Sequence, residues 1–472
     1  MAAVSELVVV ANRGPTVRID QSGALQIGPS AGGLAPSFYR ALQGTGARWV
    51  AAALSDAERE AATRGVPREL AGGIDLSFVA FDQEVFAAAY NVIANGTLWF
   101  LFHEMFDAPR RPLFDRYWHD AWAQFHAYTK GFSDEVARTA SEGATVVVND
   151  YHLALLGSYL ARERPDLRTV HFTHTPFCSP SALALLPPGP REELLVSFAS
   201  FGATGFHVDR WADAFRACAA ATGLEPEIFT APLGVDQDEL AELSGSPAVS
   251  GHYERLIDGL EGRQLIARTD RVELSKNIVR GFLAFGELLE AEPRRRGRVR
   301  FVARVYPSRT GIAEYLAYEN EVTRAAERVN ERFGSGDDTP VVLEVGDDLA
   351  SSLALLRAYD VLLVNPIRDG MNLVAKEGPS VNQRDGVLAL SRQAGAFDEL
   401  GHAALPIEPF DISGTAAQLG RALDLDVAER RVRSVELRRA ARGLSPARWL
   451  DEVMTHARIP SGPRGVGVTS RR

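Results

Sequence analysis

The chain has 472 residues, a formal net charge of −10 and 46% hydrophobic residues. This length exceeds what one ordinary hydrophobic core accommodates, so we expect two domains of roughly 200 residues each. Proteins that wrap a nucleic-acid backbone usually carry net positive charge, so the acidic balance argues against a nucleic-acid partner. Any anionic ligand must instead be held by a local cluster of Arg and Lys. Two cysteines give no disulfide framework.

The first residues lack a basic start followed by an apolar run, so we expect no secretory signal. Purely apolar runs such as Val146–Val148 and Val361–Val364 have the length of a strand and fall far short of a membrane span. These features predict a soluble, cytoplasmic protein with no membrane partner.

Short apolar runs alternate with helix-period stretches along the chain, which indicates βαβ units around parallel sheets. The pattern restarts after Gly234, so the sequence predicts an α/β fold with two doubly wound sheets joined near residue 235. The tail Ile459–Arg472 has no periodicity and is expected to be disordered. A helix is predicted over Ile278–Ala291, and strands are predicted at Leu7–Ala11, Ala144–Val148, Thr169–Thr173, Gln264–Ala267, Val299–Val305, Val341–Val345 and Val361–Val364.

Polar residues follow several of these strands, at the sheet edge where open α/β proteins bind ligands. Asp150 and His174 each end a strand of the first half and could share one cleft. Asp150 would orient or deprotonate an acceptor hydroxyl, and His174 would hydrogen-bond a sugar. A purely structural role for His174 is the alternative. His152, His171 and His174 have no metal-ligand spacing with Cys, so no metal is predicted.

The segment Ser30–Leu34 follows the first strand and contains Gly32 and Gly33. Adjacent glycines allow backbone N–H groups to approach a phosphate at a helix N-terminus. An ordinary tight turn is the alternative interpretation.

Arg271 and Lys276 are predicted to lie on a loop after the strand Gln264–Ala267 and before a helix. Two cations at that edge could neutralise a diphosphate leaving group, because Arg can bind two oxygens at once. Solvated surface charges would show the same spacing.

The segment Arg368–Glu377 follows the strand Val361–Val364. Gly370 permits a sharp turn into a helix, so the amides of 370–373 would point at an anion or at sugar hydroxyls. Asp369 could accept hydrogen bonds from a sugar, and Glu377, one to two helical turns inside, could hold a ribose diol. A capped helix with a surface carboxylate is the alternative.

Taken together, these motifs resemble the trehalose-6-phosphate synthase family, retaining glycosyltransferases of family 20 with the GT-B architecture, of the actinobacterial type. The resemblance runs from about Leu7 to Leu450. The segments that carry it are Ala11-Asn12-Arg13, Ser30–Leu34, Tyr90-Asn91, Leu98-Trp99, Asp150–Leu153, His174–Phe177, Arg271–Lys276, Pro307–Arg309 and Asp369–Glu377.

The resemblance implies two Rossmann-like domains that face each other across a cleft. Residues 1–235 would bind the acceptor, residues 236–458 would bind the nucleotide sugar, and residues 459–472 would form the tail. The helix around Ser445–Val453 would cross back to the first domain. The implied reaction transfers glucose, with retention, from GDP-glucose or UDP-glucose to glucose 6-phosphate, by front-face displacement and without metal or cofactor.

The resemblance also implies a role for each site residue. The acceptor would contact Arg13, Tyr90, Trp99, Asp150 and Arg309, with the two arginines on its phosphate; Trp49 matches a further acceptor contact less closely. The donor would contact Gly33, His174, Arg271, Lys276, Asp369, Gly370, Met371, Asn372, Leu373 and Glu377. Among these residues, Asp150, His174, Arg271 and Lys276 would be catalytic.

Three residues depart from the common family pattern: Phe100 after Trp99, Asn149 before Asp150, and Asn277 after Lys276. The segment between Cys218 and Pro232 is also short. These features resemble the actinobacterial branch, in which some members prefer GDP-glucose, so the expectation favours GDP-glucose and leaves UDP-glucose open.

Two other functions remain open on the same fold. A pseudo-glycosyltransferase would couple a nucleotide-activated cyclitol to an amino-cyclitol phosphate, and a regulatory relative would bind sugar phosphates without catalysis. Arg13, Arg271, Lys276 and Asp369 are all present, which favours the glycosyltransferase. Assembly into a homo-oligomer is left open.

Overall fold

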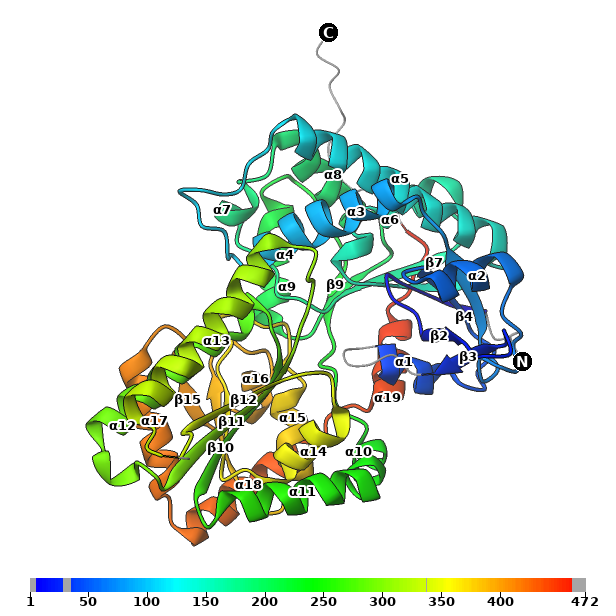
Figure 1. Ribbon diagram of the computed structural model, residues 1–472. Helices are drawn as coiled ribbons and strands as arrows, with labels where there is room; N and C mark the ends of the chain where they lie inside the picture. The colour runs from blue at the N-terminus through cyan, green and yellow to red at the C-terminus, as the bar shows by residue number, and fades with distance from the viewer. Residues whose placement is uncertain (1–5, 29–34, 337, 461–472) are drawn as a thin grey trace. The chain divides into compact units, whose positions relative to one another are not determined.

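The computed structural model describes residues 6–28, 35–336 and 338–460. The chain forms two compact units (Figure 1). Unit 1 comprises Met1–Pro232 with Pro446–Arg472, and unit 2 comprises Leu233–Ser445. Each unit is built on a parallel sheet with helices between successive strands, so the predicted α/β fold class is confirmed.

The main sheet of unit 1 has seven parallel strands in the order β5-β4-β1-β6-β7-β8-β9. Its central strands read as continuous apolar runs because a parallel sheet is covered on both faces. Val8–Val10 and Val146–Val148 are fully buried for this reason. A separate antiparallel hairpin, β2–β3, was not predicted. The strands are β1 (Leu7–Ala11), β2 (Thr16–Ile19), β3 (Leu25–Gly28), β4 (Arg48–Ala52), β5 (Asp75–Val79), β6 (Thr145–Asn149), β7 (Arg168–Thr173), β8 (Thr204–Phe206) and β9 (Ile228–Thr230).

The sheet of unit 2 has six parallel strands in the order β12-β11-β10-β13-β14-β15. All four strands predicted in this half are present, although their ends differ in part from the prediction. The strands are β10 (Gln264–Arg271), β11 (Val299–Tyr306), β12 (Val341–Val345), β13 (Val361–Val364), β14 (Val387–Ser391) and β15 (Leu405–Ile407).

Strand β10 corrects the prediction that Arg271 lies on a loop after a strand that ends at Ala267. The strand continues through four polar residues, and Arg271 is its last residue. Arg268 and Asp270 lie on the same face and form a buried ion pair, with 2.9 Å between Nε and Oδ2. Because paired charges can be buried within a sheet, the end of the apolar run did not mark the end of the strand.

The helices connect and flank the strands, and the predicted helix Ile278–Ala291 is present with those bounds as α12. In unit 1 they are α1 (Ala35–Leu42), α2 (Asp56–Arg64), α3 (Gln83–Ala87), the π-helix η1 (Ala88–Leu98), α4 (Trp99–Phe102), α5 (Arg116–Thr139), the 3₁₀-helix η2 (Tyr151–Leu153), α6 (Leu156–Glu163), α7 (Pro180–Leu183), α8 (Pro188–Ala199), α9 (Asp209–Ala220) and α19 (Pro446–Thr455). In unit 2 they are α10 (Gln237–Ser244), α11 (Pro247–Leu260), the 3₁₀-helix η3 (Leu274–Lys276), α12 (Ile278–Ala291), the 3₁₀-helix η4 (Pro293–Arg295), α13 (Ala313–Phe333), α14 (Leu349–Ala358), α15 (Val374–Val381), α16 (Phe397–Leu400), α17 (Ile412–Asp424) and α18 (Val427–Ala441).

The helices α3, η1 and α4 run on without a break from Gln83 to Phe102. This segment is long and apolar enough to cross a membrane, but 56% of its most apolar stretch is buried inside the protein, as in a core helix. Its π-helical part has polar side chains that bond to carbonyls five residues earlier, Asn95 to Tyr90 at 3.0 Å and Thr97 to Val92 at 2.8 Å. These side chains add hydrogen bonds to carbonyls of the π-helix, a helix type that is rare overall but frequent at functional sites.

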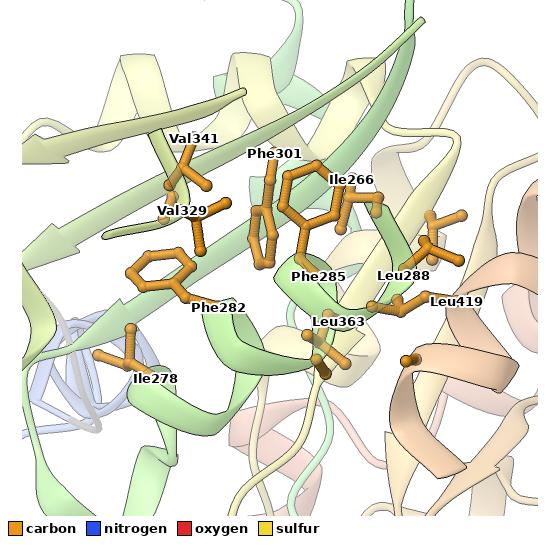
Figure 2. Packing of buried hydrophobic residues seen from close by; sticks show 14 of the residues in the cluster. Ile266, Ile278, Phe282, Phe285, Leu288, Phe301, Val329, Val341, Leu363 and Leu419 are labelled. Carbon is orange, nitrogen blue, oxygen red and sulfur yellow. The ribbon is translucent and has the colours of Figure 1, made fainter. Parts of the chain in front are cut away.

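The core of unit 2 forms where α12 packs against the sheet (Figure 2). Phe282 and Phe285 from α12 meet Phe301 from β11 edge-on, with ring centroids 5.2 and 5.5 Å apart. Ile266 of β10 and Leu363 of β13 belong to the same buried cluster. This packing anchors the ends of β10, β11 and β13, which carry the polar residues of the site.

Replacement of the central ring should loosen this core. Phe301 is 0% exposed, and Phe→Ala substitutions in a core cost about 3–5 kcal/mol. We therefore expect Phe301→Ala to accelerate hydrogen exchange in β10 and β11 strongly, as measured by mass spectrometry of the native protein. The control is Val432→Ala on α18, where the side chain is 64% exposed and a change within about 0.5 kcal/mol is expected. Equal exchange in the two variants would contradict this assignment of the core.

Candidate functional site

Asp150 follows β6 directly and has an unusual backbone conformation. Its φ of 67° and ψ of 168° fall in a region that is essentially restricted to glycine and that costs about 1–3 kcal/mol for other residues. The Asp150 N–H donates to the carbonyl of Phe172 at 2.8 Å, and the Asp150 carbonyl lies 3.1 Å from Nε2 of His171. Such strain persists where the surroundings over-determine it, typically at functional sites.

His171 supports Asp150 from within the sheet. Its side chain is fully buried, and burial lowers its pKa to about 4. The imidazole is therefore neutral at physiological pH, and Nε2 carries the hydrogen that it donates to the Asp150 carbonyl. From the sequence, His171 was only a possible metal ligand, and this supporting role was not predicted.

His174 contacts Asp150, as their shared sheet edge predicted. The backbone N–H of His174 donates to Oδ1 of Asp150 at 3.2 Å. The ring Nε2 lies 3.2 Å from Oδ1 of Asn149, and the ring Nδ1 lies 3.1 Å from Nε2 of His207. Because Asn149 Nδ2 lies 3.4 Å from the carbonyl of Val10, the Asn149 oxygen is the acceptor. His174 therefore carries its hydrogen on Nε2 and accepts one from His207.

The His174 ring is neutral within this hydrogen-bonded chain. Burial, followed by the neighbouring His207, holds the pKa of His174 well below its ordinary value. Both ring nitrogens are engaged by residues of the same unit, so the chain also fixes the orientation of the ring. His207 was not predicted from the sequence, although it follows β8 directly, just as Asp150 and His174 directly follow strands.

The other residues assigned to the acceptor in unit 1 differ in accessibility. Arg13 follows β1 and is exposed. Tyr90, on η1, is partly exposed and stacks on His152, with 5.6 Å between ring centroids. Trp99 is only 1% exposed and stacks on His103. Trp49 is fully buried within β4. Arg13 and Tyr90 thus present accessible groups, whereas the two tryptophans are part of the interior.

In unit 2, Lys276 and Asp369 form an ion pair. Lys276 is the cation predicted to bind the diphosphate, and Asp369 is the residue predicted to bind the sugar. Lys276 ends the helix η3, and its Nζ donates to Oδ2 of Asp369 at 2.6 Å. Asn372 Nδ2 donates to the same oxygen at 3.1 Å. Burial opposes the charge of Lys276, but Asp369 and then Asp270 raise its pKa above the ordinary value, so the ammonium stays charged.

The two candidate-site arginines of unit 2 share one buried carboxylate. Arg271 Nε and Arg309 Nη1 each lie 3.0 Å from Oε1 of Glu273, whose side chain is only 2% exposed. Arg309 also donates to the hydroxyl of Tyr315 at 2.6 Å. The structure therefore brings together the arginine assigned to the donor diphosphate and the one assigned to the acceptor phosphate. Glu273 was not predicted from the sequence, where the only local sign of its role is its position between Arg271 and Lys276.

The segment after β13 differs from the prediction in two details. The residue with positive φ is Asn372, at 75°, and not Gly370. Gly370 is instead covered by Gly395, where an added Cβ would lie 2.0 Å from the Gly370 carbonyl oxygen. The buried side chain of Met371 and its carbonyl, which accepts from the N–H of Ala396 at 2.8 Å, hold the turn in place.

Glu377 lies in the first turn of α15, not one to two turns inside, because the irregular turn continues through Leu373 and the helix begins at Val374. Burial and then Glu239 raise the pKa of Glu377, Lys276 opposes the rise, and the resulting pKa is about 7. Near neutral pH this carboxyl group therefore exchanges between donor and acceptor forms.

Gly33, with the rest of the segment Ser30–Leu34, lies outside the described residues, as do residues 461–472 of the tail. Within the part of the chain that the structure describes, no cluster of three or more His, Cys, Asp or Glu residues could hold a metal ion.

A model of glycosyltransferase family 20 matches residues 5–458 of the chain. An Arabidopsis thaliana α,α-trehalose-phosphate synthase (UDP-forming) is 33% identical over 450 residues, which are 90% of this chain and 47% of that protein. The chain thus spans about half the length of this curated relative.

Two solved structures are similar over nearly their whole length. An α,α-trehalose-phosphate synthase (UDP-forming) from Burkholderia xenovorans in complex with glucose 6-phosphate is 29% identical, with a TM-score of 0.81 over 95% of this chain and 99% of that one. An E. coli protein bound with UDP-2-fluoro glucose is 27% identical, with a TM-score of 0.83 over 95% and 99%. The predicted GT-B architecture is confirmed by these similarities.

The raised pKa of Glu377 predicts a pH-dependent contribution to stability. Its folded pKa lies above the ordinary value of 4.5, so the protonated carboxyl stabilises the fold below that value, and the contribution is lost as pH rises through about 7. We expect Glu377→Gln to gain unfolding free energy relative to the parent between about pH 5 and pH 8. Denaturant unfolding at both pH values measures this difference. Glu408→Gln, at an exposed carboxylate, should show no such trend; a flat difference for Glu377→Gln as well would refute the raised pKa.

Proposed function

The chain belongs to glycosyltransferase family 20, and from this membership we propose that it is a trehalose-6-phosphate synthase. It transfers glucose, with retention of configuration, from a nucleoside-diphosphate glucose to glucose 6-phosphate. The observation that carries the proposal is the group of cations at the carboxyl ends of β10 and β11, formed by Arg271, Lys276 and Arg309. Similar proteins with glucose 6-phosphate and with UDP-2-fluoro glucose support both substrate classes.

Lys276 and Arg271 stabilise the leaving diphosphate in this proposal. An ammonium has three N–H donors, so Lys276 can keep its bond to Asp369 and still donate to a phosphate oxygen. The planar fork of Arg271 matches two oxygens of a diphosphate. Each preorganised hydrogen-bond donor that points at developing negative charge stabilises the transition state by about 3 kcal/mol.

Asp369 and Glu377 bind the donor by its hydroxyl groups. Asp369, oriented by Lys276 and Asn372, accepts hydrogen bonds from the glucose. The carboxylate of Glu377 accepts from the ribose diol, and the backbone of Gly370, Met371 and Leu373 lines the turn between them. Gly33 contributes at the diphosphate, in accordance with the family pattern.

The acceptor is bound through its phosphate by Arg13 and Arg309. Tyr90 stacks beside it, and the buried Trp99 supports this part of unit 1 through packing on His103. Asp150 orients the attacking hydroxyl, and His174, whose ring is held by Asn149 and His207, contacts the donor glucose. The hydroxyl attacks on the side from which the diphosphate leaves, and a phosphate oxygen takes its proton, so no protein nucleophile is needed.

Two lines of support point to different donor bases. The family members named above are UDP-forming, whereas Phe100, Asn149 and Asn277 resemble a branch that includes users of GDP-glucose. We further propose that the enzyme is soluble and cytoplasmic, since 56% of the most apolar stretch of the helical segment Gln83–Phe102 is buried inside the protein.

The test of the proposed function is turnover with glucose 6-phosphate and each of GDP-, UDP- and ADP-glucose. Nucleotide release is followed, and NMR of the product establishes the configuration of both anomeric carbons. An α,α-linked disaccharide phosphate supports the proposal. Release with no disaccharide, or no turnover with any donor, overturns it.

Arg13 should act on the acceptor and not on the donor. We expect Arg13→Ala to raise the KM for glucose 6-phosphate by about tenfold or more, because a charged hydrogen bond to phosphate is worth roughly 1.5–3 kcal/mol. The KM for the nucleotide sugar should stay nearly unchanged. Steady-state kinetics with both substrates varied measures this, with exposed Arg116→Ala as the control. Equal use of glucose and glucose 6-phosphate by the parent would contradict the assignment.

Lys276 should act mainly on the rate of transfer. We expect Lys276→Ala to lower kcat by about 10²–10³-fold, because it removes a charge that stabilises the leaving diphosphate in the transition state. Lys130→Ala, on the surface of α5, is the control and should keep the parent rate. Single-turnover measurements at saturating substrates give the comparison; near-full kcat in Lys276→Ala would rule out this role.

A further inference from the structure

Glu273 is a buried anion between two cations that the proposed function assigns to different substrates. Its Oε1 lies 3.0 Å from Arg271 Nε and 3.0 Å from Arg309 Nη1, and it accepts from Ser308 Oγ at 3.2 Å. The residue stands between the end of β10 and the start of η3, and its N–H donates to the carbonyl of Arg271 at 2.8 Å. One oxygen atom thus connects the ends of two neighbouring strands.

Both arginines depend on this carboxylate for their orientation. Arg271 is oriented through Nε, and Glu273 is the first cause of its raised pKa. Arg309 has a backbone φ of 49°, and its guanidinium is held between Glu273 and the hydroxyl of Tyr315. Two guanidinium groups this close repel each other unless an anion lies between them, and removal of one partner from a buried ion pair leaves the others uncompensated.

We propose that Glu273 is a positioning residue that fixes Arg271 and Arg309 relative to each other and thereby supports binding of both the donor diphosphate and the acceptor phosphate. This inference rests on the proposed function for the two phosphate ligands. Glu273 touches neither ligand in the proposal and acts through the arginines. An anion at either arginine meets a guanidinium that is already oriented, so less conformational entropy is lost on binding.

The same unit contains a matched arrangement remote from these residues. Asp360 immediately precedes β13, at the amino end of the strand, and is also buried. Its Oδ1 lies 3.2 Å from Arg384 Nη2 and 3.1 Å from Arg430 Nη2, so it is likewise shared by two arginines. A general effect of neutralising a shared buried carboxylate should therefore appear in Asp360→Asn as well as in Glu273→Gln.

The experiment measures binding by calorimetry to the full-length parent, Glu273→Gln, Glu273→Asp and Asp360→Asn. The ligands are glucose 6-phosphate, the nucleoside diphosphate of the preferred donor, and the corresponding nucleoside without phosphate. We expect Glu273→Gln to weaken binding of both phosphate ligands by about tenfold or more and to leave the nucleoside unchanged. Glu273→Asp should recover part of the affinity because it keeps the charge, and Asp360→Asn should bind all three ligands like the parent.

Three outcomes would overturn the inference. Loss of affinity for only one phosphate ligand would show that Glu273 does not serve both arginines. Equal losses for the nucleoside, or the same losses in Asp360→Asn, would show a general structural effect. Unchanged binding in Glu273→Gln would show no role. Turnover by the parent is measured in parallel, so that a failure of the proposed reaction is distinguished from a failure of Glu273 to position the arginines.

Discussion

In each unit all strands of the main sheet run in the same direction, so their carboxyl ends meet along one edge. Strand interiors in such sheets are covered on both faces and must be apolar, which leaves the strand ends as the place where polar groups gather. In unit 1 this edge holds Asp150 and His174. In unit 2 it holds Arg271, and the turn after β13 supplies Asp369. The chemistry assigned to the chain depends on this one constraint.

The burial of charged side chains is energetically costly, and unit 2 contains several of them. In unit 2 several buried or half-buried cations are matched with an acidic partner: Arg268 with Asp270, Lys276 with Asp369, and Arg271 and Arg309 with Glu273. Such pairs repay their desolvation only when their geometry is good, so they contribute little to stability by themselves. Their value lies in orientation, because a cation held by a fixed carboxylate needs little rearrangement when a phosphate binds.

Unit 1 achieves orientation differently, with neutral groups. Burial keeps His171 and His174 uncharged, so each imidazole has one donor and one acceptor and its hydrogen bonds have a defined direction. His171 supports the carbonyl of Asp150, and the chain from His207 through His174 to Asn149 fixes a second ring beside it. The strained backbone of Asp150 is thus stabilised by hydrogen bonds that come from the neighbouring strand β7.

Local pattern in the sequence determined the fold class, the positions of seven strands and most candidate residues, because apolar runs and polar residues at strand ends are properties of neighbouring residues. It could not determine pairings between distant residues. Glu273 meets Arg309 because β10 and β11 are adjacent in the sheet, and His174 meets His207 because β7 and β8 are adjacent. Likewise, the extension of β10 to Arg271 required the ion pair of Arg268 with Asp270 to be buried. The positive φ of Asp150 and the pKa of Glu377 also come from tertiary packing, since backbone strain and desolvation are imposed by atoms far away in the chain.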